Sequence, residues 1–183
     1  MFTERTTSRR SALKTLVFGV VVAAGGGAVA FVRSRGYAVP TRQLASLSPW
    51  EFAVVEQAAR RIVQPDRPDD RTIPSADDTD VAGFVDGYAS KMPAPMRRDL
   101  SRALLYLEQI APLGKGLTKR FSELSPEEQD HVLASLESSG VMALRGAWNG
   151  IKSLVFMGYY RDPRTWSIVE YDGPLLGRSG RGH

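Results

Sequence analysis

The chain has 183 residues, a formal net charge of +4, two histidines and no cysteine. Its length favours one domain of ordinary size, and a hydrophobic content of 43% is enough to build a core. The absence of cysteine excludes disulfides, thiolate metal centres, iron–sulfur clusters and thiol nucleophiles. Because His131 and His183 are the only histidines, little is left for a metal cage or an imidazole base. Composition therefore argues against most catalytic chemistry.

The basic excess lies mainly at the N-terminus. Residues 1–30 carry a net charge of +3, whereas the rest of the chain carries only +1. Nucleic-acid binding needs basic residues that are concentrated on one face of the folded body. We therefore predict no nucleic-acid partner.

The N-terminal region has the pattern of an export signal. Residues 15–32 read TLVFGVVVAAGGGAVAFV, eighteen positions without a charge, and a basic stretch precedes them. The three glycines at 25–27 dilute the hydrophobicity of this run, which disfavours export as an unfolded chain. The basic stretch resembles the twin-arginine export signal and so predicts recognition by the twin-arginine translocase. The residues that carry this signal are Arg9, Arg10, Leu13 and Lys14.

Two alternatives remain open for this segment. A general secretory signal would contain the arginine pair by chance. Retention as a membrane anchor is the other, since eighteen helical residues span about 27 Å, close to the ~30 Å hydrocarbon core. Either way, we expect the body to be periplasmic, on the outer side of the cytoplasmic membrane. We assign residues 1–36 to the signal or anchor, 37–47 to a linker and 48–183 to a helical domain.

Two helices are predicted to begin at Leu-Ser-Pro motifs. Ser48, a following proline and Glu51 fit a capping box, and apolar residues then recur at helical spacing up to a stop at Pro65. The same arrangement begins at Ser125, with Gly140 as the predicted stop.

Three more helical patterns complete the predicted domain. Apolar spacing indicates one helix around residues 81–88, one around residues 100–110 and one from about Val141 to Met157. No long stretch alternates apolar and polar residues in the manner of a strand. The predicted fold class is all-α: a compact bundle of about five or six short helices, followed by an irregular, aromatic-rich C-terminal tail.

The C-terminal tail is unusually aromatic. Five of the sixteen residues from Phe156 to Tyr171 are aromatic, and arginines are interleaved with them. Tyr, Trp and Arg are enriched at binding hot spots because they bury a large area at little rotamer cost. We predict that the tail binds a partner protein, and leave open the alternative that its rings cover the last helix. The predicted partner-binding residues are Tyr159, Tyr160, Arg161, Arg164, Trp166 and Tyr171.

A loop rich in aspartate lies between the first two helices. Six aspartates occur from Asp66 to Asp80, with two arginines among them. Such carboxylates suggest calcium, but their spacing does not match the EF-hand loop. A solvated loop that also caps the following helix is the better interpretation. We predict no catalytic, cofactor-binding or metal site in this chain.

The motifs together resemble the gluconate 2-dehydrogenase subunit 3 family. The resemblance rests on the twin-arginine signal, on LSPWEFAVVEQAARRIV (47–63), on FSELSPEEQDHVL (121–133) and above all on FMGYYRDPRTWSIVEYDGP (156–174). It implies a small, non-catalytic subunit of a membrane-associated dehydrogenase that oxidises sugars, sugar acids or alcohols. FAD is then expected in the large partner subunit, and haem in a cytochrome c subunit that often completes the complex. The loop 64–80 departs from the family in being longer and more acidic.

The predicted export route agrees with this interpretation. The twin-arginine route carries folded proteins, which matters chiefly when a cofactor is inserted in the cytoplasm. Since the chain has no recognisable cofactor site, the signal is best explained by a folded, flavin-loaded partner that travels with it. We therefore predict an export escort, or chaperone, that is also a structural subunit. The alternatives are a stand-alone exported envelope protein and an enzyme that binds a cofactor itself.

Overall fold

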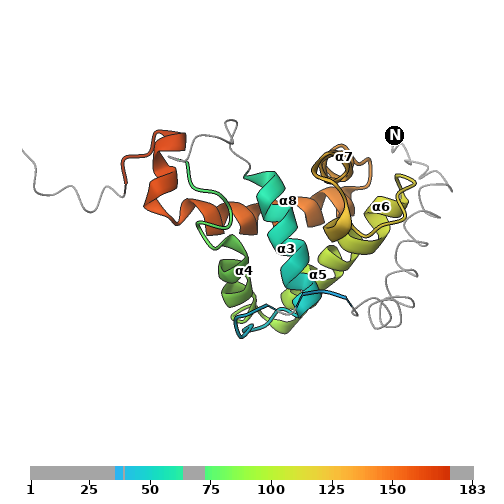
Figure 1. The fold of residues 1–183 in the computed structure, drawn as a ribbon, viewed down its shortest axis with the longest axis horizontal. Coiled ribbons are helices and arrows are strands. Elements are labelled where there is room, and N and C mark those ends of the chain that lie inside the picture. The colour runs from blue at the N-terminus through green and yellow to red at the C-terminus, as the bar shows by residue number, and fades with distance from the viewer. Residues whose placement is uncertain (1–35, 39, 64–72, 174–183) are drawn as a thin grey trace, which may run out of the picture. The chain divides into compact units, whose positions relative to one another are not determined.

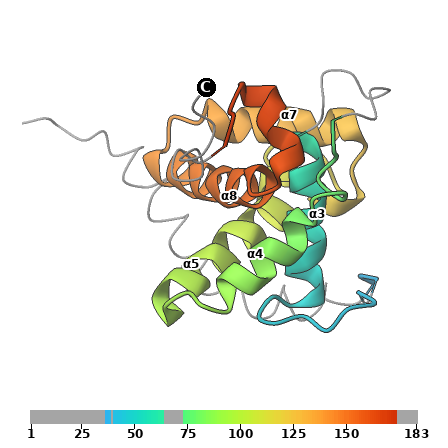
Figure 2. The same ribbon diagram turned by 90° about the vertical axis from the view of Figure 1, so that its left-hand side faces the viewer.

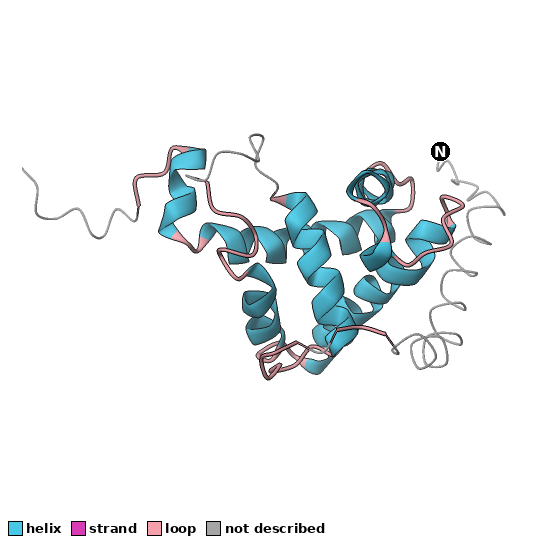
Figure 3. Ribbon diagram, viewed as in Figure 1, coloured by secondary structure: helices cyan, strands magenta, loops and turns pink. Residues whose placement is uncertain are grey.

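The computed structural model describes residues 36–38, 40–63 and 73–173 (Figure 1). The chain divides into two units, residues 1–37 and 38–183, and all the helices described below belong to the second. Within the described residues every regular element is a helix, which confirms the predicted all-α class (Figure 3). None of these helices is both long and apolar enough to cross a bilayer. The predicted export-signal residues, Arg9, Arg10, Leu13 and Lys14, lie outside the described residues.

The first described helix, α3 (Pro49–Ile62), begins as predicted at a capping box. The backbone N–H of Ser48 donates to the Glu51 carboxylate at 2.8 Å. That carboxylate also accepts from the Ser101 hydroxyl of the neighbouring helix α5 (Ala94–Leu105), at 2.5 Å. One glutamate therefore caps its own helix and links it to a second one.

Helix α4 (Val81–Ala89) carries a buried carboxylate in an otherwise apolar sequence. Asp86 accepts backbone N–H bonds from Ala45, Ser46 and Leu47 at 2.7–2.9 Å. These bonds fix the segment that leads into α3 against the side of α4. Charge-assisted bonds of this kind are stronger than neutral ones, so Asp86 holds residues 45–47 firmly against α4.

The middle of the chain forms one continuous helical stretch of three parts. Helix α5 passes into a π-helical turn, η1 (Tyr106–Ile110), and then into the short α6 (Ala111–Leu113). The π turn places Glu108 fully inside the domain, where its carboxylate accepts from both the N–H and the hydroxyl of Ser122. Ser122 belongs to the 3₁₀ turn η2 (Phe121–Glu123), so this bond ties the two segments together.

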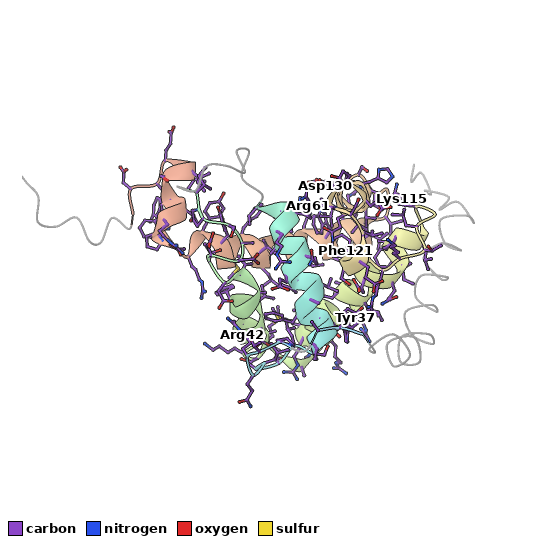
Figure 4. All side chains as sticks on the ribbon, viewed as in Figure 1. Tyr37, Arg42, Arg61, Lys115, Phe121 and Asp130 are labelled. Atoms are coloured by element: carbon purple, nitrogen blue, oxygen red, sulfur yellow. The ribbon has the colours of Figure 1, made fainter. Side chains whose placement is uncertain are left out.

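The second predicted capping box is also present. The hydroxyl of Ser125 accepts from the N–H of Glu128, whose carboxylate accepts from the N–H of Ser125, and α7 (Pro126–Glu137) begins there. The helix ends with Ser138 as its C-cap, before the predicted stop at Gly140. Arg61 of α3 and Asp130 of α7, labelled side by side in Figure 4, form a two-bond ion pair, with distances of 2.7 Å from Nε to Oδ1 and 2.5 Å from Nη2 to Oδ2.

The last helix, α8 (Met142–Tyr160), is the longest described element and packs against α3, α4, α5 and α7. It ends three residues beyond the predicted Met157. The tail that follows was expected to be irregular, but it contains another 3₁₀ helix, η3 (Pro163–Val169). The core is one cluster contributed by all the long helices, and its fully buried members include Val54, Val81, Leu104, Phe121, Val132 and Val155.

Candidate partner-docking surface

The aromatic tail is attached to the segment that precedes α4. Tyr159 is 3% exposed, and its hydroxyl donates to the carbonyl oxygen of Pro74 at 2.7 Å. Burial raises the pKa of this phenol above its ordinary value. Among the predicted partner-binding residues, Tyr159 is thus part of the core rather than of the exposed surface.

Both predicted arginines bind backbone carbonyls of the same segment. Arg161 donates to the carbonyl of Thr79 at 3.2 Å, and its guanidinium lies 5.1 Å from the centre of the Phe84 ring. Arg164 donates to the carbonyl of Asp78 at 2.9 Å. These contacts hold η3 against residues 74–79, which lie far from it in the sequence.

A carboxylate–arginine pair organises the start of η3. Asp162 is the N-cap residue and accepts from the backbone N–H of Arg164 at 2.9 Å and from its guanidinium at 2.6 Å. These bonds lower the pKa of Asp162 to about 2. The pair therefore stays ionised at any pH at which the protein is expected to work.

Trp166 contacts residues before and after it in the tail. Its indole N–H donates to the carbonyl of Tyr160 at 2.9 Å, and its ring meets Tyr171 edge to face with centroids 5.2 Å apart. Gly173 has a positive φ of 98°, and a Cβ there would lie 3.1 Å from the Trp166 ring. The glycine of the YDGP motif thus serves a turn that packs directly on the tryptophan.

Apolar side chains remain partly exposed on the outside of this folded tail. We call them the tail surface. Met157, Val169 and Tyr171 are 46%, 50% and 47% exposed, and Phe156 pairs with Tyr160 at 6.0 Å between ring centroids. Large apolar groups that stay exposed on a hydrogen-bonded support suit protein binding. The tail surface consists of Phe156, Met157, Tyr160, Ile168, Val169 and Tyr171.

The aspartate-rich loop is described only from residue 73 onward; Asp66, Asp69 and Asp70 lie outside the described residues. In the described part, Asp77 pairs with Arg60 and Asp80 pairs with Arg42, each at 2.9 Å. Asp80 is the N-cap residue of α4, but its side chain makes no capping bond, so the predicted carboxylate cap is wrong at this position. No group of three metal-ligating side chains occurs among the residues that the structure describes.

Sequence reasoning missed a second surface, a groove between α4, α5 and α8 with a cavity volume of about 610 Å³. Figure 2 shows α8 lying across α4 and α5, which it contacts. The α8 side of the groove includes three small residues, Ala143, Ala147 and Gly150. Their spacing of three to four positions is the signal that the sequence contained. We call this hollow the α8 groove.

The chain matches a known family over most of its length. The sequence model described as Gluconate 2-dehydrogenase subunit 3 matches residues 49–173, which include α3 through η3 and the whole tail surface. Neither the curated proteins nor the solved structures contain a match to this chain. The family match and the all-helical fold confirm the resemblance inferred from the motifs: the chain belongs to the gluconate 2-dehydrogenase subunit 3 family.

Proposed function

We propose that this chain is the small accessory subunit of a membrane-associated, FAD-dependent dehydrogenase, which it escorts through the twin-arginine route to the periplasm. The family is described as a subunit of gluconate 2-dehydrogenase, which supports membership of a dehydrogenase complex. FAD is assigned to the large partner subunit and haem to a cytochrome c subunit. The chain itself contributes docking and the export signal.

The observation that carries this proposal is the construction of the tail surface. Five backbone or side-chain bonds at Tyr159, Arg161, Arg164 and Trp166 hold the segment in one conformation. A rigid support reduces the ordering entropy that binding would otherwise cost. Exposed apolar groups on such a support favour a stable protein partner over a solvated end of the chain.

Export is tested by replacing Arg9 and Arg10 together with lysine. If the escort role holds, both this chain and the flavoprotein remain in the cytoplasm, which fractionation and flavin fluorescence of the periplasm would detect. The matched control replaces Arg33 and Arg35, which lie beyond the apolar run, with lysine, and should leave export intact. Arrival of the flavoprotein in the periplasm despite the Arg9/Arg10 change would rule out the escort role.

Docking is tested on the purified complex with Tyr160→Ala and Trp166→Ala. Each truncation is expected to weaken association with the large subunit by about 2 kcal/mol if the ring is a hot spot. Thermal unfolding of the isolated variants separates lost binding from lost folding, which matters most for Trp166 because its indole also bonds to Tyr160. Unchanged co-purification with stoichiometric flavin would show that the rings serve only the fold. Flavin bound to the isolated chain would instead favour the enzyme alternative.

A further inference from the structure

The α8 groove is lined by apolar and small side chains from three elements. Met96 and Leu100 come from α5, Tyr88 from α4, and Ala147 and Leu154 from α8. Met96 is 57% exposed although it belongs to an otherwise well-packed domain. A hollow of this composition is the usual receptor for the apolar face of a helix, whose side chains at positions i, i+3, i+4 and i+7 enter it.

The floor of the groove allows close approach of another backbone. A Cβ added at Gly150 would meet no heavy atom within 4 Å, so the space above this glycine is open. Glycine in a helix interior lowers helix stability relative to alanine, and such a residue is commonly kept where two backbones approach. Gly150 thus sits where a bound helix would pass nearest to α8.

Two basic residues next to the groove lining have no ion-pair partner among the described residues, whereas the carboxylate in the lining is paired. Lys91 and Arg97 adjoin the lining residues Met92 and Met96, and neither forms an ion pair within the described part of the chain. Helix α8 adds no free charge to the groove, because Arg145 donates to the carbonyl of Ser139 and Lys152 pairs with Glu137 of α7 at 2.5 Å. The exposed carboxylate in the lining, Asp99, is already paired with Arg102 at 3.0 Å. An occupant with acidic residues beside its apolar face is therefore complementary in charge.

The groove also continues into the tail surface. Leu154 lines the groove, and Met157, one helical turn further along α8, is the first member of the tail surface after Phe156. A single partner can cover both areas without leaving an apolar edge in water. This continuity favours one partner that covers both the groove and the tail surface.

We propose that the α8 groove receives an amphipathic helix of the large dehydrogenase subunit, with an apolar face flanked by acidic residues. This inference rests on the proposed function. A second copy of the chain fits less well because an isologous contact would bring two basic rims together. A bilayer surface fits less well because it is flat on this scale and would leave the floor at Gly150 uncovered.

The first test uses a matched pair of glycine variants of the full chain, co-expressed with the large subunit. Gly150→Leu fills the groove, whereas Gly87→Leu makes the same change on α4, at another position where a Cβ meets nothing within 4 Å and which does not line the groove. We expect Gly150→Leu to weaken binding of the large subunit at least ten-fold and Gly87→Leu to leave it unchanged. Circular dichroism is expected to show both variants folded.

The second test concerns charge and the identity of the occupant. Lys91→Glu with Arg97→Glu should slow association and reduce its salt dependence, whereas Lys115→Glu with Lys119→Glu, away from the groove, should not. A photo-crosslinking amino acid at position 96 should label an acidic, amphipathic segment of the large subunit. Labelling of a second copy, of lipid or of a different kind of segment would overturn the inference.

The outcomes separate the two proposals. If the wild-type chain binds no flavin-containing subunit, the proposed function fails and the inference fails with it. If the wild type binds the flavoprotein and Gly150→Leu binds it equally well, the groove proposal alone is overturned.

Discussion

The hydroxyl of Tyr159 donates a hydrogen bond of 2.7 Å to the carbonyl oxygen of Pro74, eighty-five positions earlier in the sequence. Both residues are buried, so the bond joins the end of α8 to the segment before α4 out of contact with water. Arg161 and Arg164 bind carbonyls of the same segment, so the Tyr159 bond is one of three that attach the tail to it. The position of the tail surface therefore depends in part on a contact in the core.

Removing this hydroxyl should destabilise the domain measurably. Tyr159→Phe keeps the ring but leaves the Pro74 carbonyl without its donor, which we expect to cost about 1–3 kcal/mol in the free energy of unfolding. Tyr160→Phe is the matched control, since the neighbouring hydroxyl has no hydrogen bond to any of the described residues. Urea denaturation of the three proteins measures the difference. Equal stabilities would show that the Tyr159 bond contributes nothing net.

The carboxylate of Asp86 should be a larger determinant of stability. Three backbone N–H groups, those of Ala45, Ser46 and Leu47, lose a charged acceptor in Asp86→Ala, so we expect a loss of at least about 3 kcal/mol. Hydrogen exchange at these three amides should accelerate together. Asp99→Ala is the control: the Asp99 side chain is 72% exposed and pairs with Arg102 on the surface, so its loss should cost less than about 0.5 kcal/mol. Slow exchange of residues 45–47 in Asp86→Ala would contradict this role.

The sequence predicted the elements whose signals are local. Both capping boxes lie within four consecutive residues, and the helices at Ser48 and Ser125 begin where they were expected. The extent of α8 was less predictable, since the helix continues through Gly158 beyond the predicted end at Met157. In the folded chain this glycine is a packing position, since a Cβ there would lie 2.9 Å from the Phe84 ring. That requirement depends on α4, which lies more than seventy residues away.

The candidate docking surfaces could likewise be predicted only in part from the sequence. The sequence marked the aromatic tail by composition, yet composition could not distinguish Tyr159, which is buried, from Tyr171, which is half exposed. The α8 groove arises only when three separate elements pack, so the small residues spaced along α8 could mark one of its sides but not the groove itself. Asp86 did carry a signal: a lone carboxylate in the apolar sequence VAGFVDGYA predicts burial with a partner, but not which partner.

Two glycines of α8 should respond in opposite directions to alanine. Gly158→Ala pushes a methyl group against Phe84 and Val81, at 2.9 and 3.2 Å, and we expect overpacking to outweigh the helix propensity gained, for a net loss of about 1 kcal/mol. Gly150→Ala meets nothing within 4 Å and should gain about 0.5–1 kcal/mol. Thermal unfolding of both variants measures the contrast. A gain at both positions would show that α4 and α8 do not pack at Gly158 as described.

The Asp162–Arg164 ion pair at the start of η3 predicts how the titration of Asp162 differs from that of an ordinary aspartate. The pKa of Asp162 falls from its ordinary 3.8 to about 2, chiefly through the side-chain bond from Arg164. Because the folded-state pKa is the lower one, the stabilisation from this carboxylate is present above pH 4 and is lost as the pH falls through about 2. Carbon-detected NMR at pH 3 should therefore find Asp162 mostly ionised, although an ordinary aspartate is by then mostly protonated. In Arg164→Gln the pKa of Asp162 should return toward 3.8, whereas Arg145→Gln, whose guanidinium donates to the carbonyl of Ser139, should leave it unchanged. An ordinary titration of Asp162 in the wild-type chain would mean that η3 is not held by this pair in solution.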